Sequence, residues 1–163
     1  MTTRTRSLLG LAGWIALTFV AAAAGAMASI DAAGYYGQLV RPSWAPPASL
    51  FGPAWTVLYV LMAVAAWQVW RLKGFAGARA ALLLFIVQLA VNALWTWTFF
   101  QWHRGALAFF VVIALWLLIA ATLVAFWRHS RLAGALLVPY LAWVTFASAL
   151  TYAVWQGNSG LLG

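Results

Sequence analysis

The sequence predicts an all-α integral membrane protein, a bundle of five transmembrane helices forming a single domain over residues 1–163. Hydrophobic residues make up 67% of the chain and charged residues only 6%, whereas soluble domains carry about 25% charged residues. The apolar residues are gathered in five segments of roughly 20 residues, the length that crosses a bilayer as a helix. Every charged residue lies before the first segment or in a break between two segments.

The first predicted span covers residues 8–30 and follows Arg4 and Arg6. Its apolar run is longer than the roughly 7–15 residues of a signal peptide, so we expect a retained span. A break at residues 31–49 follows, in which Pro42 and the pair Pro46-Pro47 exclude a continuous helix and favour extended or turn structure. We call residues 31–49 the proline-rich loop.

The other spans are predicted at residues 50–70, 80–100, 106–127 and 132–155. Arg71, Lys73 and Gly74 end the second span, and short polar stretches at residues 101–105 and 128–131 end the third and fourth. Because these breaks are short, consecutive helices are predicted to be antiparallel neighbours.

The positive charges predict a topology. The N-terminus and the second and fourth loops carry Arg4, Arg6, Arg71, Lys73, Arg79, Arg128 and Arg131, whereas the first and third loops carry only Arg41 and Arg104. In a bacterial inner membrane this asymmetry predicts a cytoplasmic N-terminus and an external C-terminus. The basic residues are scattered singly and form no basic face, so nucleic acid is not expected as a partner.

Several kinds of chemistry are excluded by what the spans lack. The chain has no cysteine, and no Asp, Glu, Lys or Arg lies within a predicted span, which disfavours proton-coupled pumps. His103 and His129 fall in different loops on opposite predicted faces. The sequence therefore predicts no metal site, no obligatory cofactor and no conventional acid–base or covalent catalysis.

Uncharged polar and aromatic residues recur at helical spacing on three of the spans. These stripes are Trp55, Tyr59, Met62 and Ala66; Gln88, Asn92, Trp95 and Phe99; and Tyr140, Trp143, Ala147 and Leu150/Thr151. Steps of three and four place each set on one helical face, and the amides of Gln88 and Asn92 must face the bundle interior. Two interpretations remain open: interhelical hydrogen bonds with aromatic packing, or an aromatic pocket for a flat hydrophobic ligand.

The chain contains twelve tryptophans, more than two interfacial belts need. Those assigned to the span ends are interpreted as interface anchors: Trp14, Trp70, Trp102, Trp127 and Trp155. Trp55, Trp95 and Trp143 instead share faces with polar residues, so we assign them to the candidate pocket.

The segment from Arg41 to Pro47, with Trp44-Ala45-Pro46-Pro47 at its end, resembles the signature of the TspO/MBR family. The resemblance continues through Trp55 and Tyr59 and through the stripe from Gln88 to Phe99. It recurs in the stretch from Val138 to Ala147 and extends to Asn158, so it covers most of the chain in order.

This resemblance implies a five-helix bundle, commonly a homodimer, with a pocket beneath the first loop. Family members bind porphyrins, haem-like tetrapyrroles and benzodiazepine-type ligands, so porphyrin or haem is expected here as a ligand. Carried over by position, the ligand-binding residues are Tyr36, Trp44, Trp55, Tyr59, Asn92, Trp95, Trp143 and Ala147. The chain departs from the family pattern at Gly37 and Thr151, and no basic residue follows Tyr152, so the cholesterol motif of animal members is not matched.

The leading functional hypothesis is a membrane receptor or carrier that binds a tetrapyrrole or another flat hydrophobic molecule in this pocket. The resemblance also implies an enzymatic alternative, light-dependent porphyrin degradation with Trp55 and Trp143 as the catalytic residues. A third hypothesis is a regulatory scaffold that senses tetrapyrrole.

Overall fold

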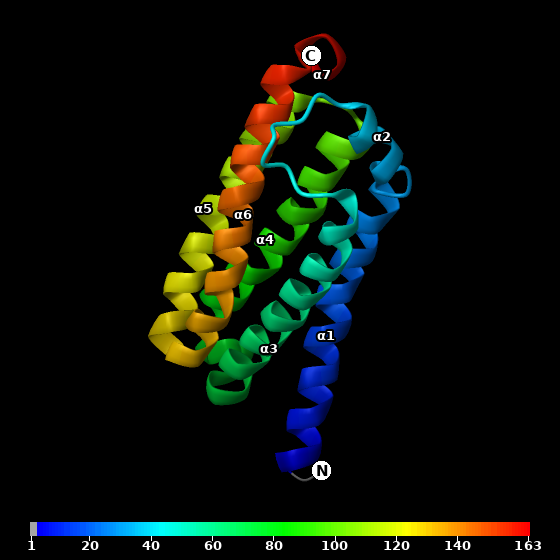
Figure 1. The fold of residues 1–163 in the computed structure, drawn as a ribbon. Coiled ribbons are helices and arrows are strands. Elements are labelled where there is room, and N and C mark those ends of the chain that lie inside the picture. Colours follow the sequence, from blue (N-terminus) through cyan, green and yellow to red (C-terminus); the bar gives the residue numbers. More distant parts are fainter. Residues whose placement is uncertain (1–2) are drawn as a thin grey trace.

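The computed structural model describes residues 3–163 and confirms the all-α fold (Figure 1). Five of its helical segments are long and apolar enough to cross a membrane: Thr3–Ala28, Ala48–Gly77, Arg79–Gln101, Gly105–His129 and Arg131–Gly157. They correspond to α1 (Thr3–Ala28), η1 (Ala48–Leu50) with α3 (Phe51–Gly77), α4 (Arg79–Thr96) with η2 (Trp97–Gln101), α5 (Gly105–His129) and α6 (Arg131–Gly157). Two short helices, α2 (Ala32–Gln38) and α7 (Ser159–Leu162), lie outside the spans.

The proline-rich loop is partly helical. Its first residues form α2, because the prolines that exclude a helix begin only at Pro42. Residues 39–47 are irregular, and η1 then leads directly into α3. The loop thus consists of a short helix and an irregular strap that cross one end of the bundle (Figure 1).

Helix α1 begins at Thr3, five residues before the predicted span, so Trp14 lies in the middle part of the helix and not at its end. The indole is only 8% exposed and packs edge-on against Phe85, with 5.8 Å between the ring centres. The interpretation of Trp14 as an interface anchor is therefore wrong. The helix extends back to Thr3, so Trp14 lies well inside it.

Helices α5 and α6 form a tight antiparallel pair. Ser130 separates them, and its hydroxyl accepts a hydrogen bond from the Ala133 backbone N–H at 3.3 Å, capping α6. Gly134 then lies against Trp127, where an added Cβ would be 2.9 Å from the Trp127 Cα. The glycine allows the two backbones to approach this closely.

Helix α1 packs against different partners along its length. Near its N-terminus the Ser7 carbonyl accepts a hydrogen bond from the Trp67 indole of α3 at 2.9 Å. Near its C-terminus the Ala24 carbonyl accepts one from the Trp97 indole of η2, also at 2.9 Å. Helix α1 therefore contacts α3 near its own N-terminus and the end of α4 near its C-terminus. Because of this crossing, the last turns of α1 lie apart from the first turns of α3.

Candidate functional site

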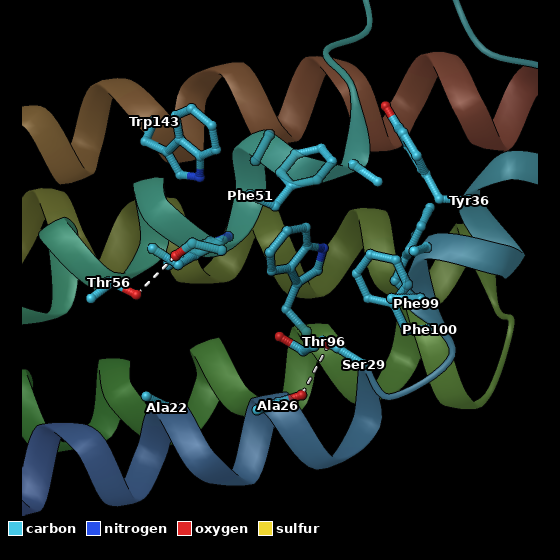
Figure 2. A pocket seen from close by; sticks show the side chains of 18 of the residues that line it. Ala22, Ala26, Ser29, Tyr36, Phe51, Thr56, Thr96, Phe99, Phe100 and Trp143 are labelled. Carbon is cyan, nitrogen blue, oxygen red and sulfur yellow. Dashed lines mark hydrogen bonds between the residues drawn. The ribbon is translucent and has the colours of Figure 1, made fainter.

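A cavity of about 440 Å³ lies in this space, beneath α2 and between α1, α3, α4 and α6 (Figure 2). This volume falls in the range of about 300–1,000 Å³ that is typical of small-molecule sites. Figure 2 shows Trp143 and Phe51 on one side of the cavity and Ala22 and Ala26 of α1 on the other. Every described residue that lines the cavity is uncharged.

Trp55 lies at the centre of the aromatic wall. Its ring centre is 6.1 Å from that of Trp95 and 6.5 Å from that of Trp143. Tyr59, one turn further along α3, lies 5.6 Å from the same indole. The rings are tilted or edge-to-face, as aromatic pairs prefer. This wall offers ring faces in several orientations to a flat apolar ligand.

The Trp95 indole N–H is a buried polar group without a partner. The side chain is 8% exposed, and its Nε1 has no hydrogen-bond partner among the described residues. An unpaired buried donor costs free energy, about 1–3 kcal/mol. Trp95 lines the cavity, so the wall includes a donor that no residue among 3–163 satisfies.

A helical irregularity positions the residues at the loop end of the cavity. After Thr96 the chain changes from α-helical to π-helical geometry, and the Trp102 N–H bonds the Trp97 carbonyl at 2.9 Å. Such wider turns occur frequently at functional sites. Here the π-helical turn carries Phe99 and Phe100, which both line the cavity.

Helix α2 covers the cavity through Tyr36. This buried side chain packs edge-on against Phe51 at 5.4 Å, and its hydroxyl donates a hydrogen bond to the Pro46 carbonyl at 3.3 Å. The Arg41 guanidinium lies over the Tyr36 ring, 4.9 Å from the ring centre. Burial raises the pKa of the Tyr36 phenol, and Arg41 opposes this shift. The hydroxyl therefore remains a hydrogen-bond donor at neutral pH.

The strap after α2 is fastened to the end of α6 by Asn158. The Asn158 amide oxygen accepts a hydrogen bond from the Val40 N–H at 2.9 Å, and its NH₂ donates to the Val40 carbonyl at 2.8 Å. The same NH₂ also donates to the Val154 carbonyl at 2.8 Å. We call the paired bonds between Asn158 and Val40 the clasp. It holds the strap against the C-terminal end of α6.

A ring of hydrogen bonds lies behind the aromatic wall. The Tyr59 hydroxyl donates to the Asn92 side-chain amide oxygen, Oδ1, at 3.2 Å, and the Asn92 NH₂ donates to the Tyr140 hydroxyl at 2.7 Å. Tyr140 in turn donates to Gln88 at 2.7 Å, and Gln88 contacts the Met62 sulfur at 3.8 Å. Since Tyr59 and Met62 both belong to α3, the chain of bonds leaves α3 and returns to it through α4 and α6.

Six of the eight residues assigned to ligand binding line the cavity: Tyr36, Trp55, Tyr59, Trp95, Trp143 and Ala147. Trp44 and Asn92 do not. Trp44 is 50% exposed and packs edge-on against Phe146, with 5.8 Å between the ring centres. Asn92 is almost fully buried, and its amide is used by the two tyrosines. In this structure Asn92 positions Tyr59 and belongs to the interhelical network, which was the alternative interpretation of the polar stripe.

Helix α1 forms a whole side of the cavity that the sequence analysis did not assign. Its lining residues are Phe19, Ala22, Gly25, Ala26 and Ser29. The spacing from Phe19 through Ala22 and Ala26 to Ser29 has the same steps of three and four as the assigned faces. These residues are mostly small and resemble the rest of an alanine-rich helix, so the periodicity did not distinguish them.

Further lining residues lie beside the assigned ones on the other helices. They are Ala32 and Ala33 of α2; Ala48, Phe51, Gly52 and Thr56; Thr96, Phe99 and Phe100; and Leu150 and Thr151. Phe99, Leu150 and Thr151 belong to the stripes recognised in the sequence, and the others come from the turns where the helices begin or end.

Comparison with known proteins identifies the family of this chain. Residues 14–156 match the model of the TspO/MBR family. Protein CrtK of Rhodobacter capsulatus is 45% identical, with 89% of this chain and 92% of the relative covered. A tryptophan-rich sensory protein of Cereibacter sphaeroides is 43% identical, with 87% of this chain and 90% of the relative covered. The human translocator protein is 40% identical, with 79% of this chain and 78% of the relative covered. The chain belongs to the TspO/MBR family of integral membrane proteins.

Proposed function

We propose that this protein is a membrane receptor or carrier that binds a tetrapyrrole, such as a porphyrin or haem, or another flat hydrophobic molecule. The observation that carries the proposal is the cavity of about 440 Å³ walled by the indoles of Trp55, Trp95 and Trp143. Flat aromatic ligands are held by such ring faces together with a few polar groups. The cover formed by α2 and the strap shields the bound ring from water.

Titration with protoporphyrin IX tests this proposal. The ligand is expected to quench the tryptophan fluorescence of the purified protein in nanodiscs saturably. Trp143→Leu removes one aromatic face of the wall and leaves the hydrogen bonds behind the wall intact. An aromatic contact contributes about 0.5–1.5 kcal/mol, so we expect the affinity of this variant for protoporphyrin IX to fall about 3- to 10-fold.

Trp102→Leu is the matched control, because Trp102 is half exposed at the same end of the molecule and does not line the cavity. It should leave the affinity unchanged. Equal affinities for the two variants, or quenching that does not saturate, would refute the assignment of the site.

A specific observation also favours the enzymatic alternative. Trp55 is in ring contact with both Trp95 and Trp143, so electrons can pass between these indoles. An indole that gives one electron to a photoexcited porphyrin becomes a radical cation, and the porphyrin radical anion passes the electron to dioxygen, which becomes superoxide. The indole radical cation then takes an electron back from the porphyrin, and the resulting porphyrin radical cation combines with superoxide, so that in sum one dioxygen is added to the macrocycle and the indole is restored. The titration repeated under light tests this: equal loss of the Soret band in the parent and in the double variant Trp55→Phe/Trp143→Phe excludes it.

The proposed topology has the N-terminus in the cytoplasm of a bacterial cell and the C-terminus outside the inner membrane. Its support is the placement of the basic residues at the bundle end where α1 begins, α3 meets α4 and α5 meets α6 (Figure 1). The chain lacks cysteine, so Ala45→Cys introduces a single label site in the strap. Labelling of residue 45 from the cytoplasm alone would reverse the proposed topology.

We also propose that the protein is a homodimer, and cross-linking of the protein in nanodiscs tests this.

A further inference from the structure

The cavity offers no charge to its ligand, whereas a porphyrin such as protoporphyrin IX carries two carboxylates. Every described residue that lines the cavity is uncharged. Both propionates of the porphyrin lie on one edge of its ring, and a carboxylate that enters an uncharged lining loses its hydration without gaining a counter-ion. We therefore expect the carboxylate edge of the ring to lie outside the cavity, beside a cation.

Arg41 is a cation beside the cover, and it has no carboxylate partner. Its guanidinium lies 4.9 Å from the centre of the Tyr36 ring, and Tyr36 lines the cavity. The chain has one acidic side chain, Asp31, which precedes α2, whereas Arg41 follows α2. Arg41 forms no ion pair with any of the residues 3–163. A guanidinium that lies over a ring keeps the N–H groups at its edge available as donors.

The Tyr36 side chain separates the cavity from a second, open hollow in the strap. This strap hollow is lined by Leu39, Arg41, Pro42, Ser43, Ala45 and Pro47. The Tyr36 hydroxyl donates to the carbonyl of Pro46, which lies between two residues of this lining, at 3.3 Å. That distance is long for a hydroxyl donor, so the side chain between the two spaces is held there by a weak bond.

The strap hollow lies at the end of the bundle, outside the spanning helices (Figure 1). It offers the Arg41 guanidinium and the Ser43 hydroxyl, and both are exposed residues. A guanidinium binds a carboxylate through charge-assisted hydrogen bonds, often two in parallel. The hollow thus supplies, beside the cover, the charge that the cavity lacks.

We propose that the strap hollow is a carboxylate subsite: the ring of the ligand occupies the aromatic cavity, and Arg41 binds a propionate carboxylate at the strap. This inference deepens the proposed function and rests on it. A propionate holds its carboxylate beyond the ring edge on a short flexible chain, so the ring keeps its contacts with the indoles while the carboxylate lies at the strap. The subsite gives the ring one orientation, with its carboxylate edge toward water and its apolar edge toward the middle of the membrane.

Protoporphyrin IX and its dimethyl ester test the inference, because they share one ring and differ in charge. Each is titrated by tryptophan quenching into the full-length protein in phosphatidylcholine nanodiscs at about pH 8, where free carboxylates are ionised. The readout is the ratio of the diacid affinity to the diester affinity, relative to that ratio in the parent protein. A change in the cover or the cavity affects the shared ring and cancels in this ratio, as does partitioning into lipid.

Arg41→Gln is expected to lower the ratio at least 5-fold, because the carboxylate loses its cation. Arg41→Lys keeps the charge and should lower the ratio less than Arg41→Gln does. Arg104→Gln is the matched control: it removes the same charge at the same end of the bundle, where the neighbouring His103 lies 4.1 Å from the ring of Tyr35 in α2. Arg104 lines neither the cavity nor the strap hollow, so this variant should keep the ratio of the parent.

Four results would overturn the inference. A fall of less than 5-fold in Arg41→Gln would mean that the carboxylates do not use Arg41, and an equal fall in Arg104→Gln would mean that any positive charge at this end suffices. An equal fall in Arg41→Lys would show that the charge is not what matters. Loss of both ligands in Arg41→Gln would mean that Arg41 maintains the cavity. By contrast, if neither the diacid nor the diester quenches the parent saturably, the proposed function itself fails.

Discussion

Replacing Asn158 by Ala isolates the contribution of the clasp to the closed cover. The substitution removes both bonds to Val40, which measure 2.9 and 2.8 Å. With about 1 kcal/mol for each net hydrogen bond, the closed strap loses about 2 kcal/mol. Since about 1.4 kcal/mol is a factor of ten, local opening of the strap should become about 30-fold more frequent.

Hydrogen exchange followed by mass spectrometry measures this opening directly, without a ligand. The Val40 amide and the strap at residues 39–47 should lose protection about 30-fold, while the centre of α5 keeps its protection. Gln156→Ala is the control, since Gln156 is exposed one residue before the end of α6. If strap protection in Asn158→Ala stays within 3-fold of the parent, the clasp does not hold the cover and the reasoning is refuted.

Two further substitutions test the packing of the bundle by thermal unfolding in detergent. Gly134→Ala forces a Cβ to within 2.9 Å of the Trp127 backbone and should destabilise the fold by about 1–3 kcal/mol; Gly13→Ala has open space and should gain up to about 1 kcal/mol of helix propensity. Equal effects would contradict the close α5–α6 contact. Tyr140→Phe leaves both buried amides one partner short and should cost about 2–4 kcal/mol, whereas Tyr152→Phe, half exposed, should be neutral. A neutral Tyr140→Phe would show that the amides find other partners.

The fold class was predictable because the bilayer imposes simple constraints. Segments of about 20 apolar residues and charges confined to the breaks give the number of helices directly, and the structure confirms five. The limits of single helices were less predictable. Polar first turns such as Thr3 to Ser7 extend α1 beyond its apolar run, and α2 forms from a stretch that hydropathy assigns to a loop.

The site was predictable where its chemistry is distinctive and unpredictable where it depends on packing. Trp55, Trp95 and Trp143 share faces with polar residues, and all three line the cavity. The side formed by α1 depends on how that helix crosses its neighbours, which a sequence of alanines does not encode locally. The role of Asn92 depends on which tyrosines lie within hydrogen-bond distance of its amide, and the register of α3 and α6 relative to α4 determines this.

The hydrogen-bond ring that begins at Tyr59 and ends at Met62 has a consequence for assembly. In a bilayer the outside of a helix is as apolar as its inside, so burying hydrophobic surface does not select one face or one height. Sliding α4 by one turn, about 5.4 Å, would break every bond from Tyr59 to Gln88, and sliding α6 would break both bonds of Tyr140. These hydrogen bonds therefore fix the register in which independently inserted helices associate. The same bonds fix the depth of the aromatic wall in the membrane, because Tyr59 belongs to the wall and to the network.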